Sequence, residues 1–160
     1  YAVQLAKHFG AEVTGVDSSE KLDVLRSIGA DQVIDYTRED FTKNGHSYNV
    51  IFDVVGKSSF SRSIRSLKKK GFYLCANPRF SHMVRGLWTS ITSSKRVVSG
   101  AAPLDSEDLV FLNELIEEGR FKSVIDRIYS LEQIPEAHRY VETGHKKGHV
   151  AITVEHNNST

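Results

Sequence analysis

The sequence predicts an α/β fold in which a parallel sheet carries helices on both faces. Segments with the apolar pattern of strands alternate with helical segments of about ten residues, as in βαβ units with right-handed crossovers. Residues 49–55 form an almost continuous apolar run with β-branched side chains, which is typical of a strand buried on both faces. A shorter strand, 12–16, runs into Asp17 directly before a helix begins.

The first part of the chain is expected to alternate helix and strand. Apolar periodicity and helix-ending glycines predict helix, strand, helix and strand over residues 2–9, 12–16, 18–29 and 33–36. Ser18 or Ser19 can cap the second helix.

After the central strand we expect a helix, two strands and a helix over residues 58–67, 71–76, 96–100 and 105–119, with Leu109, Leu112 and Ile116 along one face of the last helix. Lys68, Lys69 and Lys70 precede Gly71 and are interpreted as cations at a helix end, where they complement the helix dipole. After Gly119 the pattern changes and need not belong to the same sheet: we expect an extended segment, a helix and a strand over 124–129, 131–142 and 150–154. The last residues, 155–160, are polar and expected to be disordered.

The composition is that of an ordinary globular domain. Of 160 residues, 39% are hydrophobic and 26% are charged. The net charge of +1 gives no broad attraction to nucleic acid or to an anionic membrane, and no apolar run approaches the roughly 20 residues that cross a bilayer. The single cysteine, Cys75, excludes an intrachain disulfide and is expected in the core. We therefore expect a cytoplasmic protein that acts on a small molecule.

Asp17 is the first candidate for ligand binding. An acid at the carboxyl end of a strand in an α/β sheet can accept two hydrogen bonds from the vicinal hydroxyls of a ribose. The alternative is a solvent-facing turn residue or a helix cap. The strand–acid–helix context favours the ribose.

Ser18, Lys21 and Tyr36 form a second candidate set. Neighbouring strand ends of a parallel sheet lie about 5 Å apart, so Tyr36 can approach Lys21 in the first turn of the intervening helix. A hydroxyl, an ammonium and a phenol together suit a 2′-phosphate, although a surface lysine and an interfacial tyrosine explain the pattern equally well. Asp17 opposes the phosphate because its carboxylate repels it.

Two further pairs of residues can each be explained either by a ligand or by a plain turn. Val55 and Gly56 follow the central strand, where a glycine lets a planar ligand approach the backbone but can also simply serve the turn. His145 and His149 are four residues apart, but glycines break any helix there and no third ligand stands near. We expect a solvated turn at these histidines and no metal site.

Several stretches resemble a known family. Residues 3–16 and 25–36, VQLAKHFGAEVTGV and LRSIGADQVIDY, resemble the cofactor domain of the medium-chain dehydrogenases/reductases, in the quinone-oxidoreductase-like branch of the zinc-type alcohol dehydrogenase superfamily. Residues 124–129 and 134–150, VIDRIY and IPEAHRYVETGHKKGHV, resemble the C-terminal stretch of that branch. The resemblance runs from Tyr1 to about Val154.

The resemblance implies a Rossmann-like domain for a nicotinamide cofactor over 1–120, without its first strand and glycine loop, and a return segment of a GroES-like catalytic domain over 121–154. Lys21 and Tyr36 match the residues that grip the 2′-phosphate in NADPH-dependent relatives, whereas Asp17 matches the acid of NAD-dependent alcohol dehydrogenases. NADP(H) is therefore favoured and NAD(H) stays open. No zinc is expected, and a homodimer can form through the edge strand 96–100.

The expected activity is hydride transfer between NAD(P)H and a carbonyl, quinone or activated alkene, with Val55 and Gly56 near the nicotinamide. No catalytic residue is assigned. As a C-terminal fragment, the chain alone is predicted to bind cofactor weakly or not at all and to be inactive, because the glycine loop supplies the donors for the pyrophosphate. Two alternatives stay open: an S-adenosylmethionine-dependent methyltransferase, and a non-catalytic cofactor sensor on the same fold.

Overall fold

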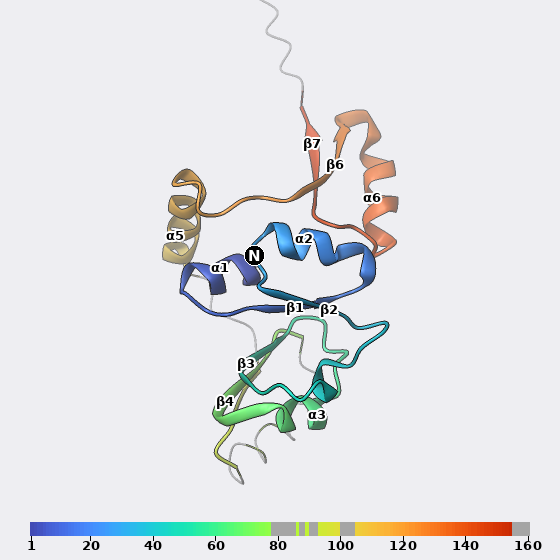
Figure 1. The fold of residues 1–160 in the computed structure, drawn as a ribbon. Helices are drawn as coiled ribbons and strands as arrows, with labels where there is room; N and C mark the ends of the chain where they lie inside the picture. The colour runs from blue at the N-terminus through green and yellow to red at the C-terminus, as the bar shows by residue number, and fades with distance from the viewer. Residues whose placement is uncertain (78–85, 87–88, 90–92, 100–104, 155–160) are drawn as a thin grey trace, which may run out of the picture. The chain divides into compact units, whose positions relative to one another are not determined.

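The structure, a computed structural model, describes residues 1–77, 86, 89, 93–99 and 105–154. The described strands all pair in parallel, which confirms the predicted α/β class (Figure 1). The chain divides into two compact units: Tyr1–Thr37 with Ser106–Thr160 (unit 1), and Arg38–Asp105 (unit 2). The domain boundary expected after residue 120 stays a prediction, and the polar tail 155–160 lies outside the described residues.

The first part of unit 1 follows the predicted alternation: α1 (Ala2–His8), β1 (Thr14–Asp17), the 3-10 helix η1 (Ser19–Lys21), α2 (Leu22–Ser27) and β2 (Gln32–Asp35). β1 and β2 pair with Asp17 opposite Asp35, and α2 contacts both strands. Gly15 permits this packing, because a Cβ at that position would lie 2.9 Å from Leu25 Cδ1. The approach of α2 to β1 fixes the start of the helix beside the end of the strand.

The rest of unit 1 comprises α5 (Ser106–Glu117), β6 (Ile125–Ser130), the 3-10 helix η3 (Leu131–Gln133), α6 (Ile134–Glu142) and β7 (His149–Thr153). Among the described residues β6 and β7 pair only with each other, so this segment forms a sheet of its own, a possibility that the sequence had left open. Figure 1 shows α6 alongside these two strands. In α5 the buried residue is Leu115, whereas Leu109 and Ile116 are exposed. Leu112 is half-buried, so the helix is present as predicted but buries only part of its apolar side chains.

Residues at the start of the chain contact the segment that follows α5 and so close unit 1. Tyr1 stacks on Phe121 with ring centroids 5.0 Å apart. Gln4 donates to the Lys122 carbonyl at 2.9 Å and accepts from the Lys122 backbone N–H at 2.8 Å. The opening helix is thus fastened to the segment that follows α5.

Unit 2 is a three-stranded sheet in the order β3-β4-β5, with α3 on one face (Figure 1). Its elements are the 3-10 helix η2 (Phe41–Lys43), β3 (Tyr48–Asp53), α3 (Phe60–Arg65), β4 (Leu67–Cys75) and β5 (Arg96–Ser99). A core of buried side chains lies between the sheet and α3, and it includes the cysteine that was predicted there: Ile51, Phe60, Leu67, Tyr73 and Cys75. β5 lies at an edge of the sheet, as predicted.

The prediction that the central strand is buried on both faces was wrong. Ile51 is buried in the core, but its neighbours Val50 and Phe52 are 51% and 48% exposed. Successive side chains of a strand point to opposite faces. The face with Ile51 packs against α3, whereas the opposite face stays half open among the described residues.

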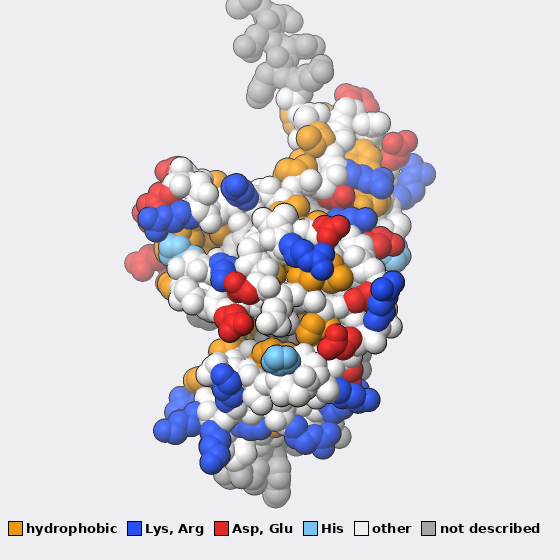
Figure 2. All heavy atoms as spheres, viewed as in Figure 1, with side chains coloured by type: hydrophobic (Ala, Val, Ile, Leu, Met, Phe, Trp, Pro, Cys, Tyr) orange, Lys and Arg blue, Asp and Glu red, His pale blue; other side chains and the backbone are white. Residues whose placement is uncertain are grey.

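The interpretation of Lys68, Lys69 and Lys70 as helix-end cations was also wrong. α3 ends at Arg65, and the three lysines lie within β4, where the pairing to β3 shifts register. Lys70 has φ 61°, which a non-glycine residue adopts only in an irregular segment. The lysines are exposed, and Figure 2 shows that Lys and Arg side chains predominate on the visible face of this unit. The near-neutral net charge of the whole chain therefore conceals a basic unit 2.

Candidate functional site

The ends of β1 and β2 bring three predicted site residues to one edge of the sheet. The Tyr36 backbone N–H donates to the Asp17 carbonyl at 3.1 Å, and the Ser18 N–H donates to Asp17 Oδ1 at 2.8 Å. Ser18 precedes η1, but its hydroxyl makes no capping bond. The Ser19 hydroxyl instead donates to the Asp35 carboxylate, across the two strand ends. The sequence predicted that Ser18 or Ser19 caps this helix with its side chain, and the structure shows neither cap.

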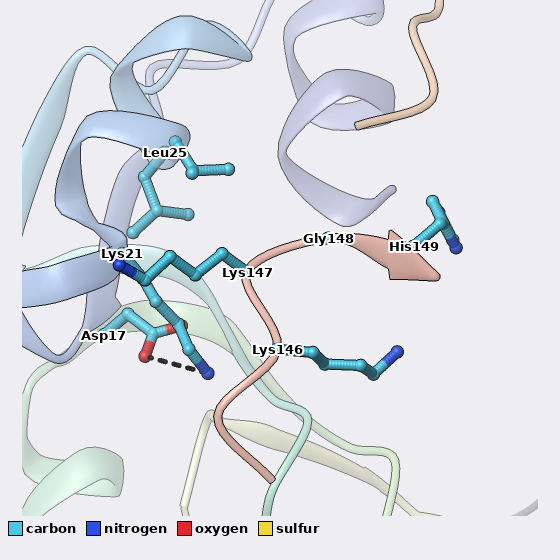
Figure 3. Close-up of a pocket in the computed structure, with 8 residues that line it drawn as sticks. Asp17, Lys21, Leu25, Lys146, Lys147, Gly148 and His149 are labelled. Atoms are coloured by element: carbon cyan, nitrogen blue, oxygen red, sulfur yellow. Dashed lines mark ion pairs between the residues drawn. The ribbon is translucent and has the colours of Figure 1, made fainter. Parts of the chain in front are cut away.

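A pocket of about 290 Å³ lies beside this edge, within unit 1 (Figure 3). The start of α2 forms one side and the turn between α6 and β7 the other. This volume is near the lower end for small-molecule sites, which begin at roughly 300 Å³. The residues lining the pocket include Asp17 and Lys21 but neither Ser18 nor Tyr36: Asp17, Lys21, Val24, Leu25, Lys146, Lys147, Gly148 and His149.

The pocket is rich in positive charge. Lys21 Nζ lies 3.9 Å from Asp17 Oδ1, and Lys147 Nζ lies 3.6 Å from Glu20 Oε2. Figure 3 shows the Lys147 side chain crossing toward α2, while Lys146 points away from the Asp17–Lys21 pair. Partly exposed ion pairs of this kind contribute at most about 1 kcal/mol each. An incoming anion with more than one charge can therefore compete for both ammonium groups.

The turn that carries the two lysines is held firmly against β6. A side chain at Gly148 would clash with the Val124 carbonyl, and the His149 N–H donates to that carbonyl at 2.7 Å. Asp126 accepts from the Tyr140 hydroxyl at 2.6 Å and from the Lys147 backbone N–H at 2.8 Å. These two hydrogen bonds, that of Tyr140 first, hold the pKa of Asp126 below its ordinary value. The backbone at Lys147 thus has a defined position beside the pocket.

Lys146 and Lys147 were not among the residues predicted for the site. They lie more than a hundred positions from Lys21 in sequence, so only the fold brings them to the same pocket. The one sequence signal was a pair of lysines directly before a glycine and the last predicted strand. His145, in the same turn, is exposed as predicted. His149 was expected in a solvated turn, but it begins β7, is half-buried and lines the pocket. The described part of the chain contains no group of three His, Cys, Asp or Glu side chains suited to a metal.

Val55 and Gly56 belong to unit 2, in the loop between β3 and α3. Gly56 has φ 72°, and a Cβ there would lie 2.9 Å from the Asn77 carbonyl oxygen. Both facts require glycine at this position. The loop therefore closes onto the backbone that follows β4, at the carboxyl edge of the sheet where α/β proteins bind ligands.

Comparison with known proteins identifies the family. Residues 28–152 match the model of a family described as zinc-binding dehydrogenase. The chain is 32% identical over 157 residues to the chloroplastic quinone-oxidoreductase QR1 of Triphysaria versicolor, across 95% of this chain and 48% of that protein. It is 31% identical over 154 residues to the chloroplastic NADPH-dependent alkenal/one oxidoreductase of Arabidopsis thaliana, across 94% of this chain and 36% of that protein.

A solved structure agrees with these relatives. The quinone oxidoreductase from Coxiella burnetii superposes with a TM-score of 0.79 at 29% identity, covering 96% of this chain and 48% of that protein. The chain thus spans half or less of the length of the relatives it matches. None of them supports the methyltransferase alternative. The chain belongs to the zinc-binding dehydrogenase family, among the quinone-oxidoreductase-like medium-chain dehydrogenases/reductases.

Proposed function

We propose that the chain is the cofactor-binding part of an enzyme that transfers hydride between NAD(P)H and a quinone, an activated alkene or a carbonyl compound. The observation that carries the proposal is the lysine-rich pocket at the end of β1, in a chain of this family. Relatives named for quinone reduction and for alkenal and enone reduction support the substrate class.

We further propose NADP(H) in preference to NAD(H). A 2′-phosphate favours a site with positive charge and hydrogen-bond donors, and Lys21, Lys146 and Lys147 line the pocket. Asp17 was expected to repel a phosphate, but its carboxylate faces the Lys21 ammonium and accepts the Ser18 N–H. Both contacts offset its negative charge. The three lysines and the neutralised Asp17 therefore support binding of the phosphorylated cofactor.

Each predicted residue keeps a proposed role. Asp17, Ser18, Lys21 and Tyr36 contact the adenosine half of the cofactor, with Lys147 added from the turn before β7. Val55 and Gly56 contact the nicotinamide half. The bound cofactor supplies the hydride, while the protein binds, orients and excludes water from it. The described residues offer no zinc ligand set, and we derive no step through zinc.

Binding and turnover of the full-length protein test the proposal. Isothermal titration with NADPH, NADH and S-adenosylmethionine should show NADPH binding most tightly, and a quinone or an enone should be reduced at the expense of NADPH. Binding of S-adenosylmethionine, without binding of NADPH or NADH, would contradict the proposed dehydrogenase function. Tight NADPH binding without hydride transfer to any acceptor would instead favour the cofactor sensor.

Assembly and compartment remain proposals. We propose a homodimer, because β5 is the last strand in the order of its sheet among the described residues, and an edge strand can pair with a strand of another chain. Light scattering on the full-length protein tests it, and a monomeric mass at micromolar concentration would contradict it.

We keep the cytoplasm as the proposed compartment, although both plant relatives are chloroplastic by name. No helix in the described part of the chain has the length and apolar character to span a bilayer.

A further inference from the structure

The carboxylate of Asp53 ends β3 and gathers hydrogen bonds from the loop that follows it. Asp53 Oδ1 accepts the Gly56 backbone N–H at 2.7 Å, and Oδ2 accepts the Ser58 hydroxyl. From the neighbouring strand, the Tyr73 hydroxyl donates to Oδ2 at 2.9 Å. One side chain thus joins the loop 54–58 to the core of unit 2.

The core side of this arrangement is rigid. Tyr73 is fully buried on β4 and meets the ring of Phe60 edge-on, with centroids 5.3 Å apart. Burial raises the pKa of Asp53, but the hydrogen bonds from Ser58, Gly56 and Tyr73 outweigh it and hold the pKa below its ordinary value. Burial first, and then the Asp53 carboxylate, raise the pKa of Tyr73. At neutral pH the carboxylate is therefore charged and the phenol is a donor.

The loop side is open. Val54 and Val55 are 56% and 62% exposed, although both are apolar and directly follow a core strand. Gly56, between them and Ser58, is fixed by its contact with the Asn77 backbone and by Asp53. The backbone of this short loop is fixed, and its two valines point outward. Such a loop is suited to contact with a planar ligand, because little conformational entropy is lost when the ligand binds.

We propose that Asp53, held by Tyr73 and Ser58, is a positioning residue that fixes the loop 54–58 for the nicotinamide half of the cofactor. The inference rests on the proposed function and goes beyond it, since it assigns a role to residues that do not contact the cofactor. The Tyr73 hydroxyl orients the Asp53 carboxylate, and the carboxylate holds the Gly56 backbone N–H. The loop then exposes Val55 and Gly56 to the cofactor.

The test separates the two halves of the cofactor in the full-length protein. Affinities for NADPH and for adenosine 2′,5′-bisphosphate, which lacks the nicotinamide half, are measured by calorimetry. In Tyr73→Phe, which loses only the hydroxyl, NADPH affinity should fall about fivefold to tenfold, a change of the size that losing one ordinary hydrogen bond produces. Affinity for the bisphosphate should change less than about twofold. Ser58→Ala should act in the same direction.

Tyr48→Phe is the matched control. Its hydroxyl accepts from Asn44 Nδ2 at 3.1 Å in the same unit, away from Asp53, so both affinities should stay unchanged. Equal losses for both ligands in Tyr73→Phe, or no loss for either, would overturn the positioning role while leaving the proposed function intact. An unaltered protein that binds neither ligand would overturn both. A merely structural role predicts a lower melting temperature without a change in the ratio of the two affinities.

Discussion

Replacing Lys21 with alanine should weaken NADPH binding by roughly tenfold and leave NADH binding nearly unchanged. Lys21 lines the pocket at the end of β1, and its ammonium is 3.9 Å from the Asp17 carboxylate. Only NADPH carries the 2′-phosphate that this ammonium is proposed to bind. The variant also leaves the Asp17 carboxylate without its lysine, which adds repulsion toward the phosphate.

The magnitude follows from the exposure of the pair. Two unit charges 4 Å apart interact by about 1 kcal/mol in bulk water and by about 4 kcal/mol at an effective dielectric constant of 20. The side chains of Lys21 and Asp17 are 27% and 36% exposed, so solvent screens much of the larger value. Lys147 remains to share the phosphate. A net loss of about 1.4 kcal/mol, or tenfold, is therefore expected.

Calorimetric titration of the full-length variant with both cofactors measures this effect. Lys122→Ala is the matched control, since Lys122 is exposed in the same unit and does not line the pocket. The loss of NADPH affinity should shrink as salt rises from about 0.05 to 0.5 M, because the distance over which charges interact shortens as ionic strength increases. Equal losses for NADPH and NADH, or the same loss in Lys122→Ala, would refute the assignment of Lys21 to the phosphate.

Three further predictions concern the supports of the two loops. Gly148→Ala should lower stability by about 1–3 kcal/mol and weaken NADPH binding, because the new Cβ clashes with the Val124 carbonyl; thermal unfolding and titration measure it. Tyr140→Phe should raise the pKa of Asp126 toward its ordinary value, since the largest cause of the lowering is lost; an NMR titration measures that pKa. The pKa of Asp53 is lowered in the folded state by its hydrogen bonds, so its contribution to stability is present above the ordinary pKa of an aspartate and lost as pH falls through the folded value. Denaturation midpoints between about pH 5 and pH 2 should therefore fall less in Asp53→Asn than in the unaltered protein.

The order of helices and strands could be predicted because its signals are local. Gly10 and Gly29, at φ 75° and 100°, follow α1 and α2, and apolar periodicity marks the segments between them. The irregular part of β4 could not be predicted in this way. Its three lysines follow a helix in sequence, and only pairing with β3 shows that they lie in a strand. Register is a property of two segments, so one segment cannot reveal it.

The residues of the candidate site also differ in whether local sequence reveals them. Asp17 and Lys21 are four residues apart, so a strand end followed by a helix start was enough to predict that they lie close together. Lys147 reaches the pocket from a turn far along the chain, and Tyr73 reaches Asp53 from the neighbouring strand. Neither contact has a local pattern. Both contacts depend on how distant segments pack, which one segment alone does not show.

The structure changes the role expected for Asp17. In the sequence, an acid at this strand end favours a ribose with two free hydroxyls and opposes a phosphate. In the structure, the carboxylate is already engaged by the Lys21 ammonium and the Ser18 N–H. On our proposal, the acid therefore orients Lys21 toward the 2′-phosphate while it contacts the adenosine half of the cofactor. The same two residues that made the cofactor ambiguous in sequence then act together, and removing Asp17 should weaken NADPH binding, where simple repulsion predicts that it would strengthen.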